Sequence, residues 1–532
     1  MFLPAGAQVT RPVVMGRTGC IVAGHHLAAQ AGFEMLLSGG NAIDAAICAA
    51  AALAVLKPDA CGLGSDLFLL YGDGKTGETY ALNASGPAPQ TATPQAYKDG
   101  MPESGLLTSA VPGAVHGWEN ALARFGTRSL ADALAPAIEL AGAGMPLSHL
   151  FAATIARYGR IMNQFPATAA IFRPGGVSPQ PGQLLVQADA CRTLQAIAAG
   201  GAAAFYEGDF ARALDAYSRA EGALLRASDL AAYRSEWREP LRMAFRDVEL
   251  IAQPPVSVGL VVLECLKILE SSAIGTYQDA GADFIHTHVE AMKIATADMR
   301  GHIADPAFSS QAPIATLLDP AYAAHRGREI DPARAQSFAA GNLGAKVPSD
   351  TSYIAVIDGD GNAVSMLQSV FSVFGSGAVV PGTGVLMNNR MTGFSLDPSS
   401  LNVVAPGKRT LHTLNPHMIR KNGRVTTALG TPGGPSQTYS HTLLIMRLIE
   451  RGLDPQHAVE AARWFVAPDG ELHVETSIAA DVRAELKRRG HVLAEDPPLS
   501  TAMGGAGIAR INEFGVREAA ADPRRESYAL AY

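Results

Sequence analysis

The sequence predicts an α+β fold, in which antiparallel strands pack against helices. Residues 351–357 and 363–369 are two apolar, strand-like runs, and the turn signal Asp358-Gly-Asp-Gly-Asn362 joins them. Residues 67–71 and 80–83 predict a second hairpin. Apolar residues also recur with helical spacing in long Ala- and Leu-rich stretches, which predict helices at 42–55, 130–143 and 191–204.

The composition is that of a large globular protein with a sizeable core. The chain has 532 residues, of which 48% are hydrophobic and 17% are charged. Its formal net charge of -7 argues against nucleic acid or an anionic membrane as the main partner, because both are negatively charged. We therefore expect no nucleic-acid partner and no membrane partner.

The 5 cysteines predict reduced, mostly buried thiols rather than a disulfide framework. Their number is odd, and no Cys-x-x-Cys pair occurs. The first residues, up to Cys20, contain no apolar run of signal-peptide length. Both features predict a cytoplasmic location.

The N-terminal region predicts two successive helices. Leu27, Ala31 and Met35 have helical spacing, and Gly39-Gly40 ends this first helix. Asn41 is a suitable N-cap for the second helix, which is apolar nearly all round and therefore belongs in a core. It is shorter than the roughly 20 residues that a membrane span needs.

Two patterns that could bind a cofactor or a metal are interpreted as structural. The Gly-x-Gly in Cys61-Gly-Leu-Gly-Ser-Asp66 precedes a strand instead of opening a helix, so it is a weak dinucleotide signal. His286 and His288, close to Glu290, are spaced by two and fall on different helix faces, whereas zinc-binding helices space two histidines by four. We expect no metal and no organic cofactor.

The first hairpin places a threonine hydroxyl beside a serine hydroxyl. With the turn centred near Asp360, Ser369 lies opposite Thr351, and their Cβ atoms are roughly 5 Å apart if they share a face. A threonine at a chain end carries its own base, because an α-amine has an unperturbed pKa of roughly 7.7 to 8.0. Taken alone, this motif is more often an ordinary strand start.

A wider set of motifs favours a catalytic threonine over an ordinary strand start. They are Gly39-Gly-Asn-Ala-Ile-Asp-Ala-Ala46, Val111-Pro-Gly113, Glu290-Ala-Met-Lys293, Thr351-Ser-Tyr-Ile-Ala-Val-Ile-Asp-Gly-Asp-Gly-Asn-Ala-Val364, Phe374-Gly-Ser-Gly377, Gly384-Val-Leu-Met-Asn-Asn389, Phe394-Ser395, Pro406-Gly-Lys-Arg409 and Gly430-Thr-Pro-Gly-Gly434. In this order, over nearly the whole chain, they resemble the γ-glutamyltransferase family of N-terminal-nucleophile hydrolases. Members of that family are made as one chain and cleave themselves before a threonine.

The resemblance implies a four-layer αββα sandwich and self-cleavage between Asp350 and Thr351. A large fragment, 1–350, and a small fragment, 351–532, would remain one folded unit. The polar, irregular segment 311–349 predicts the flexibility that cleavage needs, because the scissile carbonyl must bend back toward the Thr351 hydroxyl.

The resemblance also implies the catalytic groups. Thr351 Oγ would attack first the Asp350 carbonyl and later the substrate amide, with the new α-amine as general base and acid. Ser369 matches the position whose hydroxyl touches the nucleophile. Gly433 and Gly434 match the oxyanion-hole residues, each donor being typically worth of order 3 kcal/mol. By themselves these glycines would also fit a plain helix-entry turn.

The residues that hold a γ-glutamyl group in the family are mostly absent. Where the family has an arginine, this chain has the segment of Ser85. Where the family has an asparagine, an acidic residue and a serine pair, this chain has Phe371, Gly393 and His412-Thr413 in that order. This loss disfavours a γ-glutamyl substrate unless other residues have rebuilt the clamp, and Phe371 predicts a shorter and more apolar pocket.

Arg390 is a cation that this chain has gained near the nucleophile. A guanidinium binds a carboxylate bidentately, so Arg390 predicts a substrate with an anionic group close to its amide. A structural ion pair with a residue such as Asp397 explains Arg390 equally well.

The leading hypothesis is a self-cleaving amidohydrolase acting on a small carboxylate-bearing amide such as oxamate, as in the oxamate amidohydrolase branch of the family. The alternatives are a γ-glutamyltransferase or glutathione hydrolase with a rebuilt clamp, an acylase with a larger pocket, and a non-catalytic scaffold. Retention of Thr351, Ser369 and Gly433-Gly434 disfavours the scaffold. The expected partners are the substrate and the two fragments of the chain, and the sequence is compatible with a homodimer.

Overall fold

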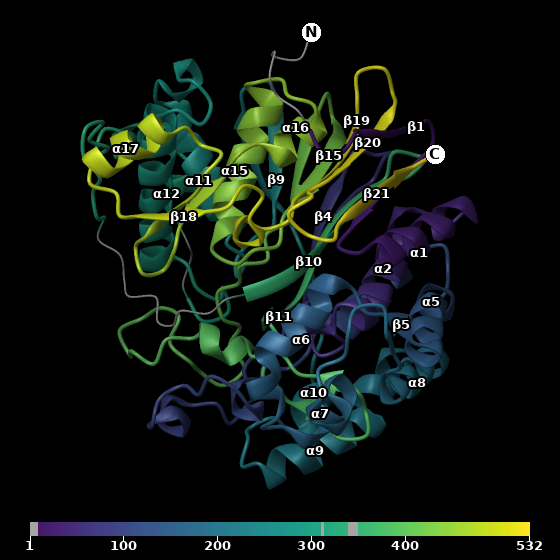
Figure 1. Cartoon of the computed structure of the whole chain (residues 1–532). Coiled ribbons are helices and arrows are strands. Elements are labelled where there is room, and N and C mark those ends of the chain that lie inside the picture. Colours follow the sequence, from purple (N-terminus) through teal and green to yellow (C-terminus); the bar gives the residue numbers. More distant parts are fainter. Residues whose placement is uncertain (1–8, 310–312, 339–348) are drawn as a thin grey trace.

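The described chain forms four layers, in which two stacked β-sheets lie between two layers of helices (Figure 1). The structure is a computed structural model that describes residues 9–309, 313–338 and 349–532. Within these residues each large sheet has seven strands, and neighbouring strands are antiparallel. The predicted α+β class and the αββα sandwich are confirmed.

The first sheet contains the predicted hairpin, and its strand order is β21-β2-β10-β11-β3-β4-β7. Its strands are β2 (Cys20–Ala23), β3 (Asp66–Gly72), β4 (Thr79–Ala84), β7 (Glu236–Arg238), β10 (Ser349–Ile357), β11 (Ala363–Ser372) and β21 (Tyr528–Ala531).

The second sheet has the strand order β1-β20-β19-β15-β14-β9-β8. Its strands are β1 (Val14–Gly16), β8 (Leu241–Phe245), β9 (Val248–Ala252), β14 (His417–Lys421), β15 (Arg424–Gly430), β19 (Gly507–Ile511) and β20 (Arg517–Ala521). Smaller sheets pair β5 (Met145–Pro146) with β6 (Leu184–Leu185), β12 (Val379–Val380) with β13 (Val385–Leu386), and β16 (Trp464–Val466) with β17 (Leu472–Glu475) and β18 (Leu493–Asp496).

Strand β10 is buried on both faces, which explains its nearly continuous apolar sequence. Successive side chains of a strand point to opposite faces. Tyr353 and Ile357 belong to the core between the two sheets, whereas Ile354 and Val356 belong to the core under the first helical layer. Strand β10 is thus held from both sides.

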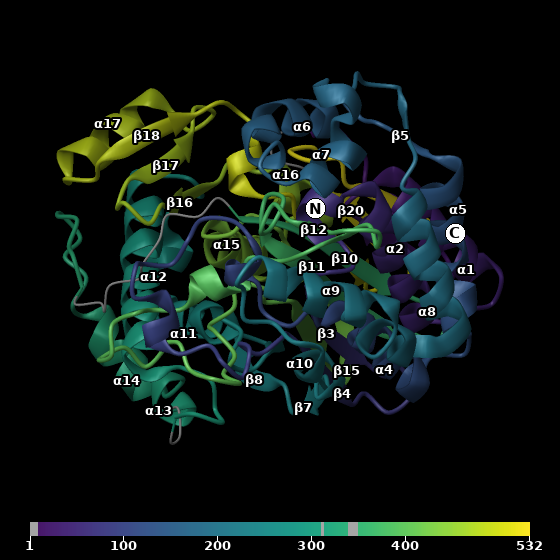
Figure 2. The same cartoon turned by 90° about the horizontal axis from the view of Figure 1, so that it is seen from below.

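The helices cover the outer faces of the two sheets. Figure 2 shows α1 and α2 on one side of the sheets and α11 and α12 on the other. The first group is α1 (His26–Leu37), α2 (Ala42–Leu56), α3 (Pro58–Cys61), α4 (Ala114–Phe125), α5 (Leu130–Ala143), α6 (His149–Met162), α7 (Pro166–Phe172), α8 (Ala188–Tyr206), α9 (Asp209–Ala220) and α10 (Ala227–Ala231). The second is α11 (Gly259–Glu270), α12 (Ala282–His302), α13 (Ile314–Leu317), α14 (Pro320–Gly327), α15 (Ser436–Ile449), α16 (Pro455–Glu460) and α17 (Ala480–Arg488).

Near the N-terminus, capping residues in the sequence correctly predict where a helix begins. Asn41 and Asp44 form a capping box at the start of α2, so each side chain accepts a backbone N–H that the helix leaves unpaired. Every residue of α2 is buried, as its all-round apolar sequence predicts. Among the described residues, no helix combines the length and the apolar character that crossing a bilayer requires.

The expectation of an irregular segment over 311–349 is only partly testable. Residues 311–312 and 339–348 lie outside the described residues. The described part contains the short helices α13 and α14, so it is more regular than the sequence predicted. Asp319 caps α14 through Ala321 N–H and Tyr322 N–H, a local signal that the broad polar composition concealed.

The cysteines are free thiols, as predicted. Four are buried, and Cys191 is partly exposed. Burial raises the pKa of the Cys20 thiol to about 12, so this thiol stays protonated.

Candidate active site

Thr351 of the central strand β10 lies opposite a β-bulge of β11, with its hydroxyl beside that of Ser369. The pairing of β10 with β11 shifts register between Asp350 and Ser352, so Thr351 faces two residues of β11, Ser369 and Val370. Thr351 Oγ1 lies 3.2 Å from Ser369 Oγ, and both residues are buried. The structure thus brings together the two hydroxyls that the hairpin pattern placed opposite each other.

The Ser369 hydroxyl connects Thr351 to the end of strand β11. Ser369 Oγ accepts a hydrogen bond from Phe371 N–H at 2.8 Å. Phe371 lies in β11 and pairs with Asp350, and its φ of 82° is uncommon for a bulky residue. Its ring lies against the guanidinium of Arg390, whose Cζ lies 4.3 Å from the ring centroid.

Arg390 is bound by Asp66, a residue that the sequence reasoning missed. Arg390 Nε donates to Asp66 Oδ2 at 2.8 Å, and the two side chains are 1% and 0% exposed. Asp66 lies directly opposite Ser369 in the pairing of β3 with β11. Neighbouring strands are about 4.8 Å apart, so the backbone of Asp66 lies roughly 10 Å from that of Thr351. The sequence feature that could have revealed Asp66 is an acidic residue at the start of an otherwise apolar strand.

His412 completes this buried cluster. Its Nε2 lies 3.1 Å from Asp66 Oδ2, and its Nδ1 lies 3.4 Å from Leu414 N. Burial, with the neighbouring Arg390 cation, lowers the pKa of His412 to about 4, so the imidazole is neutral near pH 7. Its Nε2–H therefore donates to Asp66, and its Nδ1 accepts from the backbone.

The cluster keeps Asp66 ionised although it is buried. Burial alone would raise the pKa of Asp66, but Arg390, His412 and the Gly86 N–H together hold that pKa below its usual value. Burial lowers the pKa of Arg390 and Asp66 opposes that shift, so the charged pair is maintained. The ion pair neutralises a net charge that would otherwise be very costly in the interior.

The outer edge of the Arg390 guanidinium is unoccupied by the described residues. Nη1 and Nη2 are buried, and neither has a hydrogen-bond partner in the described part of the chain. The alternative of a structural ion pair is confirmed, but the acid that binds Arg390 is Asp66 and not Asp397. Asp397 instead accepts hydrogen bonds from the N–H and hydroxyl of Ser399.

Ser85 and Thr413 lie at the border of this cluster without joining it directly. The Ser85 hydroxyl donates to Asn83 Oδ1 at 2.7 Å, and the following N–H, of Gly86, donates to Asp66 Oδ1 at 2.8 Å. Thr413 is half-buried next to His412. Two of the positions where the family holds a γ-glutamyl group therefore belong to this cluster. Phe371 contacts Arg390, and His412 contacts Asp66.

The predicted oxyanion loop lies beside the nucleophile. Pro432 and Thr351 line one small cleft. Gly433 and Gly434 follow with φ values of 130° and 57°, which L side chains rarely adopt, and α15 begins two residues later. The N-terminal end of a helix favours developing negative charge.

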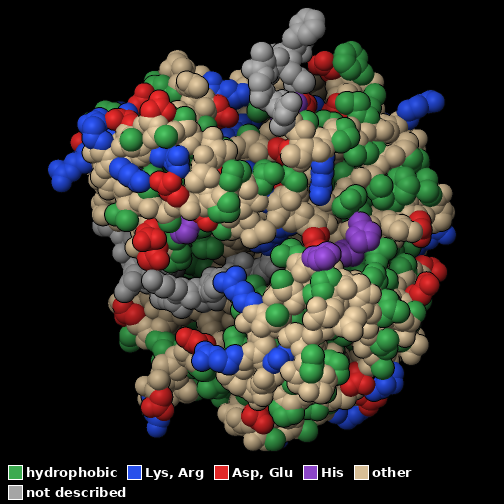
Figure 3. All heavy atoms as spheres, viewed as in Figure 1, with side chains coloured by type: hydrophobic (Ala, Val, Ile, Leu, Met, Phe, Trp, Pro, Cys, Tyr) green, Lys and Arg blue, Asp and Glu red, His purple; other side chains and the backbone are tan. Residues whose placement is uncertain are grey.

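A cavity of about 500 Å³ lies next to this loop. Gly433 lines it, as do residues of α6 and of the β16–β17 hairpin. Lys57 and Arg525 line both the cavity and the small cleft at Thr351, so they connect the two spaces. Figure 3 shows this face hollowed between its upper and lower halves, with Lys and Arg side chains at the edge of the hollow.

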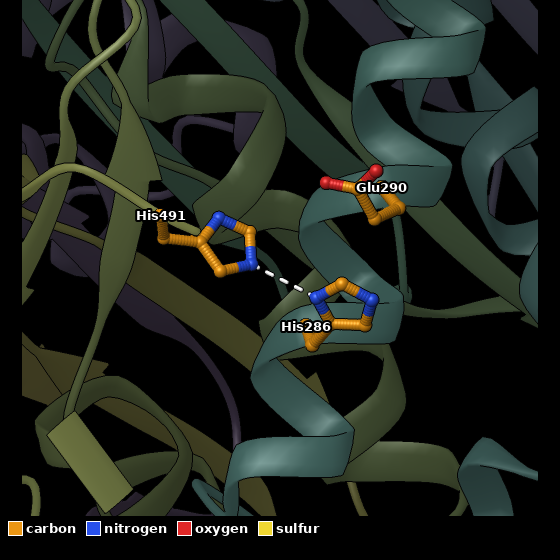
Figure 4. A group of neighbouring side chains, drawn as sticks. All are labelled: His286, Glu290 and His491. Atoms are coloured by element: carbon orange, nitrogen blue, oxygen red, sulfur yellow. Dashed lines mark hydrogen bonds between the residues drawn. The ribbon is translucent and has the colours of Figure 1, made fainter. Parts of the chain in front are cut away.

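A second buried cluster contains possible metal ligands, His286, Glu290 and His491. Figure 4 shows the two imidazoles pointing toward each other, with His286 Nδ1 2.9 Å from His491 Nε2. Glu290 accepts from Lys293 Nζ at 2.7 Å and from Gln336 N–H at 2.9 Å. These contacts engage the same atoms that would bind a metal ion, and the Lys293 cation disfavours a second positive charge.

The spacing argument could not reveal this cluster, because His491 comes from a distant part of the chain. His288 lies on another face of α12, as predicted, and its Nε2 contacts Thr442 Oγ1. His286 and His288 are both fully buried.

Comparison with known proteins places nearly the whole chain in one family. The family model described as "Gamma-glutamyltranspeptidase" matches residues 28–532. The "Glutathione hydrolase-like YwrD proenzyme" of Bacillus subtilis is 36% identical over 97% of this chain and 99% of its own length. The "Acylase ACY 1 proenzyme" of Pseudomonas sp. (strain SE83) is 38% identical over 97% and 94%. The "Oxamate amidohydrolase proenzyme" of Klebsiella pneumoniae is 35% identical over 97% and 98%.

Among solved structures, a cephalosporin acylase from Bacillus halodurans has the same fold. It superposes with a TM-score of 0.91 at 35% sequence identity, over 100% of this chain and 99% of its own. The relatives thus carry at least three different activity names at similar identity, so family similarity alone does not select the substrate.

Proposed function

The chain belongs to the gamma-glutamyltranspeptidase family, and we propose that it is a self-cleaving amidohydrolase that acts on a small carboxylate-bearing amide such as oxamate. The products would be oxalate and ammonia. Relatives at 35% to 38% identity are named as proenzymes, which supports the self-cleavage in this proposal.

Cleavage would begin with the Thr351 hydroxyl. Its oxygen attacks the Asp350 carbonyl, and the peptide C–N bond breaks as the ester forms, which frees the α-amine of Thr351. Water then hydrolyses the ester, which releases the Asp350 carboxylate and restores the Thr351 hydroxyl. The bulge of β11 opposite Thr351 supports the step, because it interrupts the regular pairing of the two strands at this position. The Ser369 hydroxyl at 3.2 Å orients the nucleophile.

Substrate hydrolysis would use the same groups. The α-amine takes the proton of the Thr351 hydroxyl while Oγ bonds to the amide carbon, and the loop of Gly433 and Gly434 stabilises the oxyanion. The proton then passes to the leaving nitrogen as the C–N bond breaks. Water hydrolyses the ester and restores the free threonine.

The buried edge of Arg390 is the observation that carries the substrate class. Nη1 and Nη2 have no partner among the described residues, although a buried guanidinium strongly favours hydrogen bonds. A carboxylate that accepts from both nitrogens would fit the planar fork. Asp66 holds the guanidinium one strand away from Ser369, so the anionic group must be close to the amide.

Turnover of glutathione is the main alternative. The residues that hold the α-amine and α-carboxylate of a γ-glutamyl group in the family are here Phe371 and His412-Thr413, together with a glycine at position 393. The Phe371 ring stacks on Arg390 and His412 bonds to Asp66, so neither side chain supplies the lost clamp.

A two-part assay tests the proposal. Intact mass spectrometry of the purified protein would show whether the chain breaks before Thr351. The same sample is then assayed for ammonia release from oxamate and for glutamate release from glutathione. Two fragments with ammonia release support the proposal, whereas two fragments that cleave only glutathione would contradict it.

A further inference from the structure

The carbonyl groups of the predicted oxyanion loop are all hydrogen-bonded within the protein. The Pro432 carbonyl accepts from Thr431 Oγ1 at 2.8 Å, and the Gly433 carbonyl accepts from Ser436 Oγ at 2.9 Å. The Gly434 carbonyl accepts from a backbone N–H of α15 at 3.1 Å. Proline has no N–H, so the N–H groups of Gly433 and Gly434 are the polar backbone groups that remain to be assigned.

The side chain of Gln437 accounts for one of these two N–H groups. Gln437 lies in the first turn of α15 and is fully buried. One polar atom of its amide lies 3.2 Å from Gly434 N, and the other lies 2.8 Å from Thr413 O and 3.3 Å from Thr431 O. A carbonyl oxygen only accepts and an N–H only donates, so Nε2 faces the two carbonyls and Oε1 accepts from Gly434 N–H.

The Gly433 N–H is the group that is left over. It makes no hydrogen bond to the residues that the structure describes, although Gly433 is buried. A buried N–H without a partner is rare in folded proteins. The nitrogen of this group is bonded to Pro432, which lines the small cleft together with Thr351. The loop therefore presents one unused donor next to the nucleophile.

Gln437 also connects the loop to a second wall of the site. The Thr413 carbonyl that accepts from its amide directly follows His412, and His412 bonds to Asp66. The glycines of the loop have φ values that favour no other residue, so the loop depends on outside contacts to stay in place. Without the amide, two buried carbonyls would lose a donor and the Gly434 N–H would lose its acceptor.

We propose that Gln437 is a positioning residue for the oxyanion. Its amide oxygen occupies the Gly434 N–H, so the Gly433 N–H is the donor with which this loop meets the oxyanion. Its amide nitrogen fixes that donor by tying the loop to Thr413. This inference rests on the proposed function and narrows the expectation of two glycine donors to one.

The variant Gln437→Met keeps the length of the side chain and removes its hydrogen bonds. We expect kcat to fall about tenfold or more, because a loosened donor stabilises the oxyanion less, whereas KM should change less than about twofold. The processed protein is assayed with oxamate and with glutathione, and the comparison uses the amide that the wild type hydrolyses. Unchanged kcat, or a change confined to KM, would overturn the inference.

The variant Gln456→Met is the matched control. Gln456 is a buried glutamine of α16 whose Nε2 donates to Ala521 O at 3.1 Å, so this variant also loses a buried amide. It should lose stability and keep kcat. An equal fall of kcat in both variants would assign Gln437 to stability alone. If Gln437→Met does not fold, Gln437→Asn, whose amide is one carbon shorter, carries the same expectations.

Hydrogen exchange tests the assignment without any turnover. Pro432 and Pro435 have no N–H, so a peptide of residues 431–436 has few exchanging amides and reports closely on Gly433 and Gly434. In Gln437→Met this peptide should take up about one more deuteron at short labelling times, because the Gly434 N–H loses its acceptor. Equal uptake in variant and wild type would overturn the inference. If the wild type hydrolyses neither amide, the proposed function fails, and the uptake alone decides whether Gln437 holds the Gly434 N–H.

Discussion

Asp66 of β3 lies directly opposite Ser369 of β11, so the carboxylate that holds Arg390 shares a strand pair with the hydroxyl that touches the nucleophile. Directly opposed residues of antiparallel strands point to the same face of a sheet. The Arg390 guanidinium and the Thr351 hydroxyl are therefore positioned by one sheet. The predictions below follow from this arrangement.

Thr351→Ala should remain a single chain of 532 residues, because no hydroxyl is left to attack the Asp350 carbonyl. Intact mass measures this directly, and the variant should release no ammonia from oxamate. Thr351→Ser keeps a hydroxyl and should still break into fragments 1–350 and 351–532. A break before residue 351 in the alanine variant would disprove cleavage by Thr351.

Arg390→Lys should lower kcat/KM for oxamate about 10- to 100-fold, the range expected when one charged hydrogen bond is lost. The lysine keeps a cation beside Asp66, so the fold should survive. Arg390→Ala should in addition destabilise the protein by about 3 to 5 kcal/mol, because Asp66 would be buried without its partner.

Steady-state kinetics and thermal unfolding separate the two effects of Arg390. Arg424→Lys, at an exposed position, is the control for the substitution itself. Unchanged oxamate kinetics in Arg390→Lys would assign the residue to structure alone.

Gly433→Ala should reduce kcat about 100-fold, in keeping with the loss of one oxyanion donor. The added Cβ would lie 2.5 Å from Ser436 Oγ and 2.8 Å from Gly504 Cα, so the loop has to shift and the N–H groups move with it. Gly423→Ala is the matched control: its φ is also positive, at 79°, but nothing lies within 4 Å of the added atom. Equal kcat values in the two variants would exclude Gly433 from the site.

Glu264→Gln should make the free energy of unfolding less dependent on pH. Burial raises the pKa of Glu264 from 4.5 to about 10, and the neighbouring Asp298 acts in the same direction. Between these two values the folded protein binds a proton that the unfolded chain has released, so stability falls as pH rises, by up to about 1.4 kcal/mol per pH unit.

Urea unfolding of both proteins at several pH values from 5 to 9 checks this dependence. The variant should lose less stability across the range than the wild type. Glu513→Gln, at an exposed position, should behave as the wild type. Parallel pH profiles for Glu264→Gln and the wild type would show that Glu264 does not carry the proton.

Local patterns in the sequence were sufficient for the elements that carry the nucleophile. The turn signal around Asp360 and the apolar runs on either side predicted the hairpin of β10 and β11, and the Ser369 hydroxyl indeed lies beside that of Thr351. Capping residues such as Asn41 and the long apolar helices likewise act over a few neighbouring residues. The short helices α13 and α14 escaped prediction. Helix α13 has only 4 residues and no side-chain cap, and the Asp319 cap of α14 lies in a segment that is polar overall.

By itself, the sequence determined the α+β class, the hairpin and the family, because periodicity and contiguous motifs depend on residues close together in the chain. The four-layer sandwich followed only from the family resemblance. Only the tertiary structure decided that Arg390 binds Asp66 rather than Asp397, that His286 meets His491, and that a large cavity opens beside Gly433. Asp66 and Arg390 are separated by 324 positions, so their pairing depends on how strands and loops pack. Burial makes this ion pair important for stability, since a buried charge without a partner strongly destabilises the folded protein.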